Sequence, residues 1–258
     1  MELEVFPDHS GSGVGLLYGG WFMYDASGHP QWLTMAGDAT SARGSSYSLE
    51  VFLNTDGNFD APPVTQSTAY GSATLTFYDC TDAALTYHLV DGRSGTIAYV
   101  RATPSSGCTN VAPATLPQPL PANYADLRHS GAWYNPATSG QGLMIEFVPA
   151  QTTFYGIWYT YAPQAEGESG FAGQRWLELW KPDYTPGDLK LDNVRILATT
   201  GGRFDTPSAV SETQVGTAQI DFTSCTSMTL KYAFTQGEFA GLSGTVDEQV
   251  IVPVTGCQ

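Results

Sequence analysis

Apolar and polar residues alternate along this chain with a period of two, the pattern of β-strands that are buried on one face. Residues 73–77, Ala-Thr-Leu-Thr-Phe, put three apolar side chains on one face and two threonines on the other. Residues 218–222, Ala-Gln-Ile-Asp-Phe, follow the same pattern. Asp91-Gly92 is typical of a tight turn between strands, and no segment shows the 3.6-residue period of a helix. The pattern predicts an all-β chain.

The chain consists of two diverged copies of one module, because its β-rich segments recur in the same order. Chance does not preserve both the order and the type of so many segments. The matched segments are 1–7 with 143–149, 18–24 with 155–161, 31–33 with 175–177, 57–62 with 202–207, 73–77 with 218–222, 85–87 with 230–232, and 94–97 with 243–246.

The second copy contains enough alternating segments for about eight strands. Sequential strands joined by short connections favour an antiparallel meander that closes into an up-and-down barrel, and a two-sheet sandwich is the alternative. We therefore predict two tandem antiparallel barrel modules. The expected strands of the second copy begin near Trp133, Leu143, Phe154, Arg175, Leu189, Ala218, Met228 and Ser243.

The opening segment of the second copy, residues 130–142, has no counterpart in the first. Met1 leads directly into the strand that follows that segment, so we expect a chain whose leader was removed and a first module that lacks one strand. An unclosed barrel exposes a sheet edge. We expect a linker segment or a neighbouring chain to cover it.

Four cysteines and a proline-rich stretch define the predicted domains: a first module at 1–108, a linker at 109–128 and a second module at 129–258. Each module carries two cysteines without the close spacing of a zinc site. We predict the disulfides Cys80–Cys108 and Cys225–Cys257. Disulfides form in oxidising compartments, so we expect a secreted or periplasmic protein.

The net charge limits the classes of binding partner that can be expected. The chain has 25 acidic and only 10 basic residues, and its formal net charge is -15. Such a surface repels phosphate backbones, so we expect no nucleic-acid partner. No apolar run approaches the roughly 18 residues of a membrane-spanning helix, and no membrane span is expected.

Several motifs of the second copy resemble those of known proteins. They are Gly131-Ala132-Trp133-Tyr134-Asn135-Pro136, Ser139-Gly140-Gln141-Gly142, and segments 157–161, 202–207 and 216–218. With these residues the chain resembles a β-rich repeat module of secreted proteobacterial proteins of unassigned function. That resemblance implies no activity. Residues 131–135 are also similar to the opening strand of avidin-like and lipocalin-like barrels, which implies a barrel that binds a small ligand at one mouth, without implying biotin.

Aromatic residues are the candidate ligand-binding groups, because Trp offers a wide apolar face and one N–H donor to a sugar ring or flat ligand. A conventional aromatic core with cross-strand pairs is the alternative. The candidates are Trp21, Tyr24 and Trp32 in the first copy and Trp133, Tyr134, Trp158, Tyr161 and Trp176 in the second.

No pattern points to catalysis: no G-x-S-x-G elbow is present, and the equivalent Glu4 and Glu146 are one acid per copy. We predict no catalytic residue, metal or cofactor. The leading functional hypothesis is a secreted, non-enzymatic binding protein for a carbohydrate or other small ligand. One alternative is a cell-surface structural or interaction protein that assembles, or self-associates, through the open edge of its first module. A hydrolase with unrecognised catalytic residues is the other.

Overall fold

The computed structural model describes residues 1–6, 13–40, 46–103, 128–163 and 170–251. These residues form β-strands joined by turns and short 3-10 helices, which confirms the all-β prediction. Residues 109–127 of the predicted linker and two of the four cysteines, Cys108 and Cys257, lie outside the described residues.

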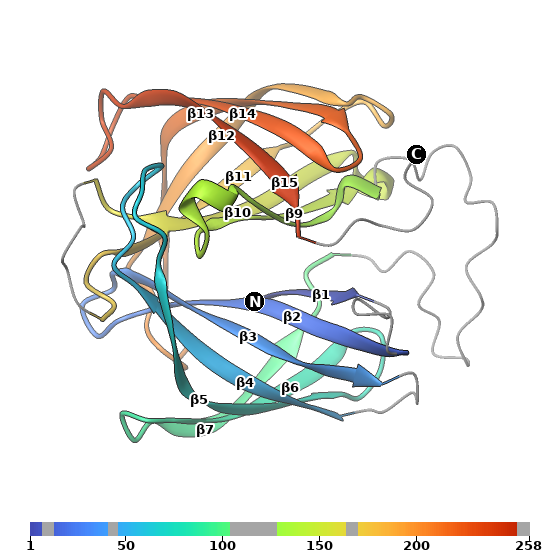
Figure 1. Ribbon diagram of the computed structural model, residues 1–258, viewed down its shortest axis with the longest axis vertical. Helices are drawn as coiled ribbons and strands as arrows, with labels where there is room; N and C mark the ends of the chain where they lie inside the picture. Colours follow the sequence, from blue (N-terminus) through green and yellow to red (C-terminus); the bar gives the residue numbers. More distant parts are fainter. Residues whose placement is uncertain (7–12, 41–45, 104–127, 164–169, 252–258) are drawn as a thin grey trace. The chain divides into compact units, whose positions relative to one another are not determined.

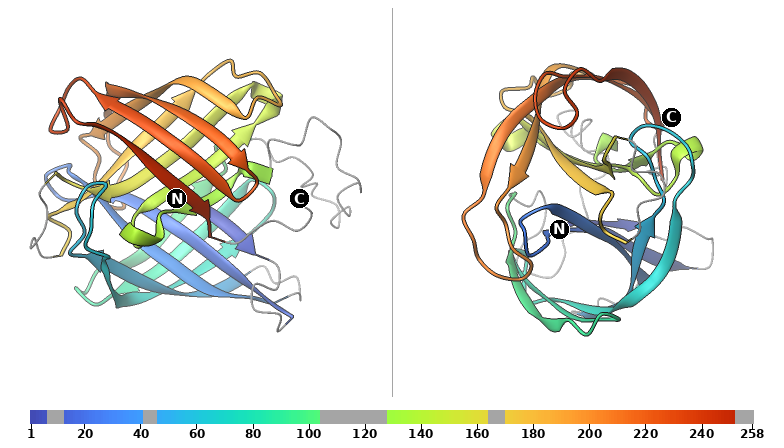
Figure 2. Two further views of the ribbon diagram at one scale, coloured as in Figure 1. Left: turned by 45° about the horizontal axis from the view of Figure 1, so that its top comes forward. Right: turned by 90° about the vertical axis from the view of Figure 1, so that its left-hand side faces the viewer.

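The first sheet, called sheet A, has seven strands in the order in which they occur along the chain. It curls into an open half-barrel, and its colours run in sequence from blue to blue-green in Figures 1 and 2. Its strands are β1 (Glu2–Phe6), β2 (Val14–Tyr24), β3 (Pro30–Thr40), β4 (Ser46–Thr55), β5 (Gln66–Phe77), β6 (Asp82–Leu89) and β7 (Ser94–Val100).

The second sheet is a closed antiparallel barrel of eight strands. It closes where Val250 of the last strand pairs with Trp133 of the first. Its strands are β8 (Gly131–Tyr134), β9 (Gly142–Val148), β10 (Thr153–Tyr161), β11 (Gln174–Lys181), β12 (Lys190–Thr200), β13 (Ser211–Ser224), β14 (Ser227–Phe234) and β15 (Ser243–Val250).

Alternation along the barrel strands builds the interior. Strand β14 turns Met228, Leu230, Tyr232 and Phe234 into the core, and the residues between them are more exposed. The same period-two pattern holds in β13 and β15, so the apolar set of each strand meets inside the barrel. The hydrophobic pattern of the sequence thus decides which face of each strand points inward.

The chain forms two compact units that do not follow the sequence halves. The first unit holds most of sheet A, in residues 1–21, 33–53 and 68–121. The second unit holds the barrel together with two segments from the first repeat copy, residues 22–32 and 54–67. Segment 22–32 is the tip of the β2–β3 hairpin, and segment 54–67 is the connection from β4 to β5.

The prediction of an antiparallel up-and-down barrel is confirmed for the second copy, where the sandwich alternative is wrong, and the first copy forms an open half-barrel. Seven strands of sheet A match seven strands of the barrel, and within the described ranges sheet A has no strand equivalent to β8. Sheet A has an open edge in the part of the chain that the structure describes, and whether the whole first copy lacks this strand stays a prediction. Whether residues 109–128 cover the edge stays a prediction.

Candidate functional site

The gap in sheet A lies between its edge strands, β1 and β7. In the barrel, the equivalent strands β9 and β15 are joined by β8, which pairs with both of them. Trp133 of β8 lies opposite Leu143 of β9 on one side and Val250 of β15 on the other. The barrel therefore shows what fills this position when the module is complete.

Side chains beside the gap are more exposed than their repeat counterparts in the barrel. Val5 of β1 is 60% exposed, whereas its counterpart Phe147 of β9 is 1% exposed. On the other side, Ile97 of β7 is half-buried, whereas its counterpart Val246 of β15 is 5% exposed. The sheet thus presents apolar surface where the barrel strand β8 buries it.

The ring that a missing strand would cover is Phe77 at the end of β5. Its counterpart in the barrel, Phe222, is buried and contacts Trp133 of β8, with 5.6 Å between the ring centroids. Phe77 is only half-buried and contacts Tyr47, with 6.0 Å between the centroids. A strand with a large aromatic residue at the position of Trp133 would bury Phe77 in the same way.

Four of the predicted ligand-binding residues, Tyr24, Trp32, Tyr161 and Trp176, meet within the second unit in what we call the outer aromatic cluster. Tyr24 lies on Trp176 with 5.3 Å between centroids, and Trp32 lies on Tyr161 with 5.7 Å. Because Tyr24 matches Tyr161 and Trp32 matches Trp176 in the repeat, these two contacts are equivalent. Phe22 and its counterpart Tyr159 complete the cluster.

Two hydrogen bonds, like the two ring contacts, join equivalent positions of the two copies. The Trp32 Nε1 donates to the carbonyl of Thr160 at 3.2 Å, and the Trp176 Nε1 donates to the carbonyl of Met23 at 3.1 Å. Met23 and Thr160 are themselves repeat counterparts. The outer aromatic cluster is therefore a self-complementary packing of equivalent residues, with its indole donors already satisfied.

The other predicted ligand-binding residues lie apart from this cluster. Trp21 contacts Tyr87 in the first unit, and Trp133 donates to the His129 carbonyl. Trp158 points into the barrel, and Tyr134 is half-buried beside Gln249. The tryptophans among the candidates are all buried, so a ligand would reach them only after a rearrangement. Ligand binding by these residues stays a prediction.

A second aromatic group fills the barrel interior, and Trp158 is its one member among the residues predicted to bind a ligand. Phe59 of segment 54–67 is 7% exposed and belongs to the barrel core. We call the rings around it the inner cage. Its members and their centroid distances from Phe59 are Phe239 at 4.8 Å, Trp158 at 5.2 Å, Tyr232 at 5.5 Å and Phe234 at 5.7 Å.

Polar contacts hold segment 54–67 on both sides of Phe59. Gln174 Nε2 donates to the carbonyl of Asn54 at 3.0 Å, and Gln141 Nε2 donates to the carbonyl of Asn58 at 2.9 Å. Further along, the backbone N–H of Thr65 donates to the carbonyl of Ser139 at 3.1 Å. Both glutamines are buried, and buried amide groups of this kind are costly to leave without partners.

The residue after Phe59 brings a carboxylate to the barrel interior. The Tyr232 hydroxyl donates to Asp60 Oδ2 at 2.6 Å. Glu248 also points inward from β15, is 4% exposed, and its Oε2 has no hydrogen-bond partner among the described residues. Burial, reinforced by the charges of Asp60 and Asp247, raises the pKa of Glu248 to about 8. Burial likewise raises the pKa of Asp60, although the Tyr232 hydrogen bond opposes that effect.

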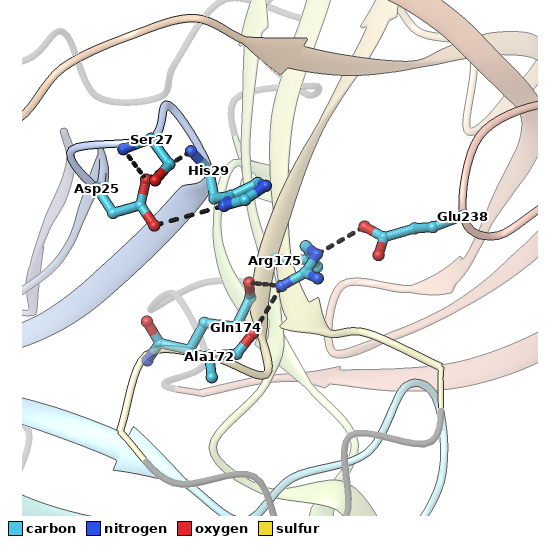
Figure 3. A network of polar contacts seen from close by, with 7 residues as sticks. All are labelled: Asp25, Ser27, His29, Ala172, Gln174, Arg175 and Glu238. Atoms are coloured by element: carbon cyan, nitrogen blue, oxygen red, sulfur yellow. Dashed lines mark hydrogen bonds and ion pairs between the residues drawn. The ribbon is translucent and has the colours of Figure 1, made fainter.

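An ion pair fixes the turn that carries Phe239, a wall of the inner cage. Arg175 Nε donates to Glu238 Oε1 at 2.6 Å, and its Nη1 donates to the carbonyls of Ala172 and Gln174 (Figure 3). Arg175 also precedes Trp176, so one residue connects the inner cage and the outer aromatic cluster. At the tip of the β2–β3 hairpin, Asp25 Oδ1 accepts hydrogen bonds from the backbone N–H groups of Ser27 and His29.

The described residues contain neither a candidate metal cluster nor a free thiol. Over the described ranges, no group of three or more His, Cys, Asp or Glu side chains is placed to hold a metal. Neither Cys80 nor Cys225 is a free thiol, and because their predicted partners lie outside the described residues, both pairings stay predictions. No helix in the described part of the chain is long and apolar enough to cross a membrane.

Comparison with protein-family models, with curated protein sequences and with solved structures finds no match for this chain.

Proposed function

We propose that this protein binds another polypeptide by accepting one of its β-strands into the gap between β7 and β1. The observation that carries the proposal is that, among the described residues, sheet A has no counterpart of the one strand that closes the equivalent sheet into a barrel. Addition of a strand to an open sheet edge is a general mode of peptide recognition, in which backbone hydrogen bonds give affinity and alternate side chains give specificity.

The barrel indicates the chemistry of the incoming strand. Strand β8 has the sequence Gly-Ala-Trp-Tyr and buries Ala132 and Trp133. Its Trp133 covers Phe222, the counterpart of Phe77. We therefore expect the partner to present a short extended segment of small residues followed by a large aromatic residue that covers Phe77.

The negative charge on β1 does not argue against such pairing. Charged residues on an edge strand often prevent association, and β1 carries Glu2 and Glu4. However, the counterpart of Glu4 is Glu146, which lies on β9, a strand that pairs with β8. A glutamate at this place is thus compatible with a paired neighbour.

The proposal is tested with a fluorescein-labelled peptide of the sequence of residues 128–141. We expect saturable binding by fluorescence polarisation, and slower amide hydrogen exchange in β1 and β7 when the peptide is bound. A peptide with aspartate in place of the tryptophan should bind at least tenfold more weakly, because it would bury a charge against Phe77. A peptide with proline in place of the alanine should also fail, because proline lacks the N–H donor.

Three results would contradict the proposal. The first is the absence of saturable binding. The second is protection of the β1 and β7 amides in the free monomer, which would mean that a segment of the same chain fills the gap. The third is a concentration-dependent dimer with protected edges, which would make a second copy of the chain the occupant.

A further inference from the structure

The barrel of the second unit holds an aromatic side chain that does not come from its own strands. Phe59 lies more than seventy residues before β8 in the sequence, and it occupies the centre of the inner cage. Barrels of this size have room for their own interior side chains or for one small ligand. Here a segment from outside the barrel occupies the place that a ligand would take.

The contacts of that segment have the character of a recognition site. An aromatic ring enters an all-aromatic cage, the following carboxylate accepts a hydrogen bond from Tyr232, and the preceding carbonyl accepts one from Gln141. Ring, carboxylate and backbone are thus each matched by a separate group of the barrel. Aromatic pairs in such tilted arrangements contribute beyond their area burial, and a hydrogen bond to a charged group is stronger than one between neutral groups.

We propose that the inner cage is a peptide-binding site for a Phe-Asp sequence, and that residues 57–62 are its tethered resident ligand. The site is separate from the gap in sheet A, and it is complete without any residue of β1 or β7. A free peptide of the same chemistry competes with the resident segment for the cage.

A double variant, Phe59→Ala with Asp60→Ala, empties the site while the backbone of the segment remains. The probe is the labelled peptide acetyl-Gly-Asn-Phe-Asp-Ala-Pro-amide, followed by fluorescence polarisation and by the emission of Trp158, whose ring lies 5.2 Å from that of Phe59. We expect saturable binding to the double variant. To the wild-type chain we expect binding at least tenfold weaker, because the tethered segment competes at high effective concentration.

Two matched changes separate specific recognition from the filling of an apolar cavity. A peptide with asparagine in place of the aspartate should bind the double variant about tenfold more weakly, because it loses the charge-assisted bond to Tyr232. Adding Tyr232→Phe should abolish that difference between the two peptides. If the double variant is folded and binds neither peptide, or binds the peptides with and without phenylalanine equally, the proposal is overturned.

A measurement on the wild-type chain keeps the proposal testable if the double variant does not fold. Excess Phe-Asp peptide should accelerate amide hydrogen exchange in segment 54–67, whereas a peptide with alanine in place of phenylalanine should not. Unchanged exchange at a saturating concentration of the peptide would overturn the proposal.

Discussion

Asp60 in the second unit combines an unusual backbone conformation with a distant side-chain contact. Asp60 adopts a positive φ of 45°, and its repeat counterpart Asp205 adopts 51°. Asp tolerates this left-handed region better than most residues. Besides its place in this local turn, Asp60 has a distant contact, because its carboxylate accepts a hydrogen bond from Tyr232. The turn geometry thus delivers the carboxylate into the barrel.

Glu248 makes the stability of the protein dependent on pH. Because its pKa rises from 4.5 to about 8 in the folded chain, the folded state keeps a proton that the unfolded state releases. The contribution of Glu248 to stability should be fully present below about pH 4.5 and be lost as pH rises through about 8. The Glu248→Gln variant should lack this component, which we expect to be on the order of 5 kcal/mol.

The measurement is denaturant unfolding of wild type and variant at pH 5 and pH 8.5. The exposed Glu50 supplies the control, because Glu50→Gln should leave the pH dependence as it is in the wild type. The same loss of stability in wild type and Glu248→Gln would show that Glu248 does not hold its proton in the fold.

Gly57 lies flat against the ring of Tyr161, so that an added Cβ would overlap the ring. Tyr161 cannot move away freely, because it is buried beneath Trp32. We expect Gly57→Ala to lower the free energy of unfolding by about 2 kcal/mol through overpacking. Gly187→Ala is the comparison, since nothing lies within 4 Å of its added Cβ and only its positive φ opposes the change. Equal thermal shifts for the two variants would contradict this account.

At the scale of elements, the strands could be predicted from sequence because each one alternates along its own length. Strand β15 begins at Ser243, as predicted, and most other barrel strands begin within a few residues of their expected starts. Strand β13 begins at Ser211, well before the expected Ala218, because its first four residues are exposed and show no apolar alternation. Local patterns of this kind say nothing about polar, outward-facing strand ends.

The inner cage could not be predicted in the same way, because its centre and its walls are far apart in sequence. In the sequence, Phe59 was visible only as part of the repeated segment Gly-x-Phe-Asp-x-Pro at residues 57–62 and 202–207. Nothing local distinguishes a phenylalanine that fills a distant barrel from one that packs beside its own strand. The repeated motif itself was the signal that could have drawn attention to Phe59.

Segment 54–67 should loosen when its side-chain anchors are removed. Gln174 and Gln141 each hold one of its carbonyls, and a buried carbonyl without a partner costs about 1–3 kcal/mol. We expect Gln141→Ala with Gln174→Ala to accelerate hydrogen exchange of residues 54–67 while β14 stays protected. Exposed Gln249 offers the control, as Gln249→Ala removes a surface amide. Unchanged exchange in the double variant would mean that the aromatic contacts alone hold the segment.

At the scale of the whole molecule, the repeat in sequence does not coincide with the compact units. The second unit takes residues 22–32 and 54–67 from the first copy, although sequence analysis placed the domain boundary at 109–128. The two copies therefore differ in structure. The sheet of the second copy is closed and forms one unit with segments of the first copy, and the sheet of the first copy is open. Residues 109–127 of the linker lie outside the described residues, so the predicted boundary itself stays a prediction.

A fragment of residues 128–258 should therefore be less stable than the barrel within the full chain. It would expose Tyr159, Tyr161 and Trp176 of the outer aromatic cluster and leave the inner cage without Phe59. We expect a lower unfolding temperature than that of the full chain and binding of a hydrophobic dye. A fragment that unfolds at the same temperature as the full chain, without dye binding, would show that the borrowed segments contribute no stability.

The reciprocal tryptophan bonds have a consequence for how the copies can diverge. Each indole donates to a main-chain oxygen, and every amino acid supplies one. The side chains at those two positions take no part in the hydrogen bonds, and one is Met23 whereas the other is Thr160. Because these hydrogen bonds use backbone acceptors, the two copies can diverge in side chain at these positions and still keep the contact between them.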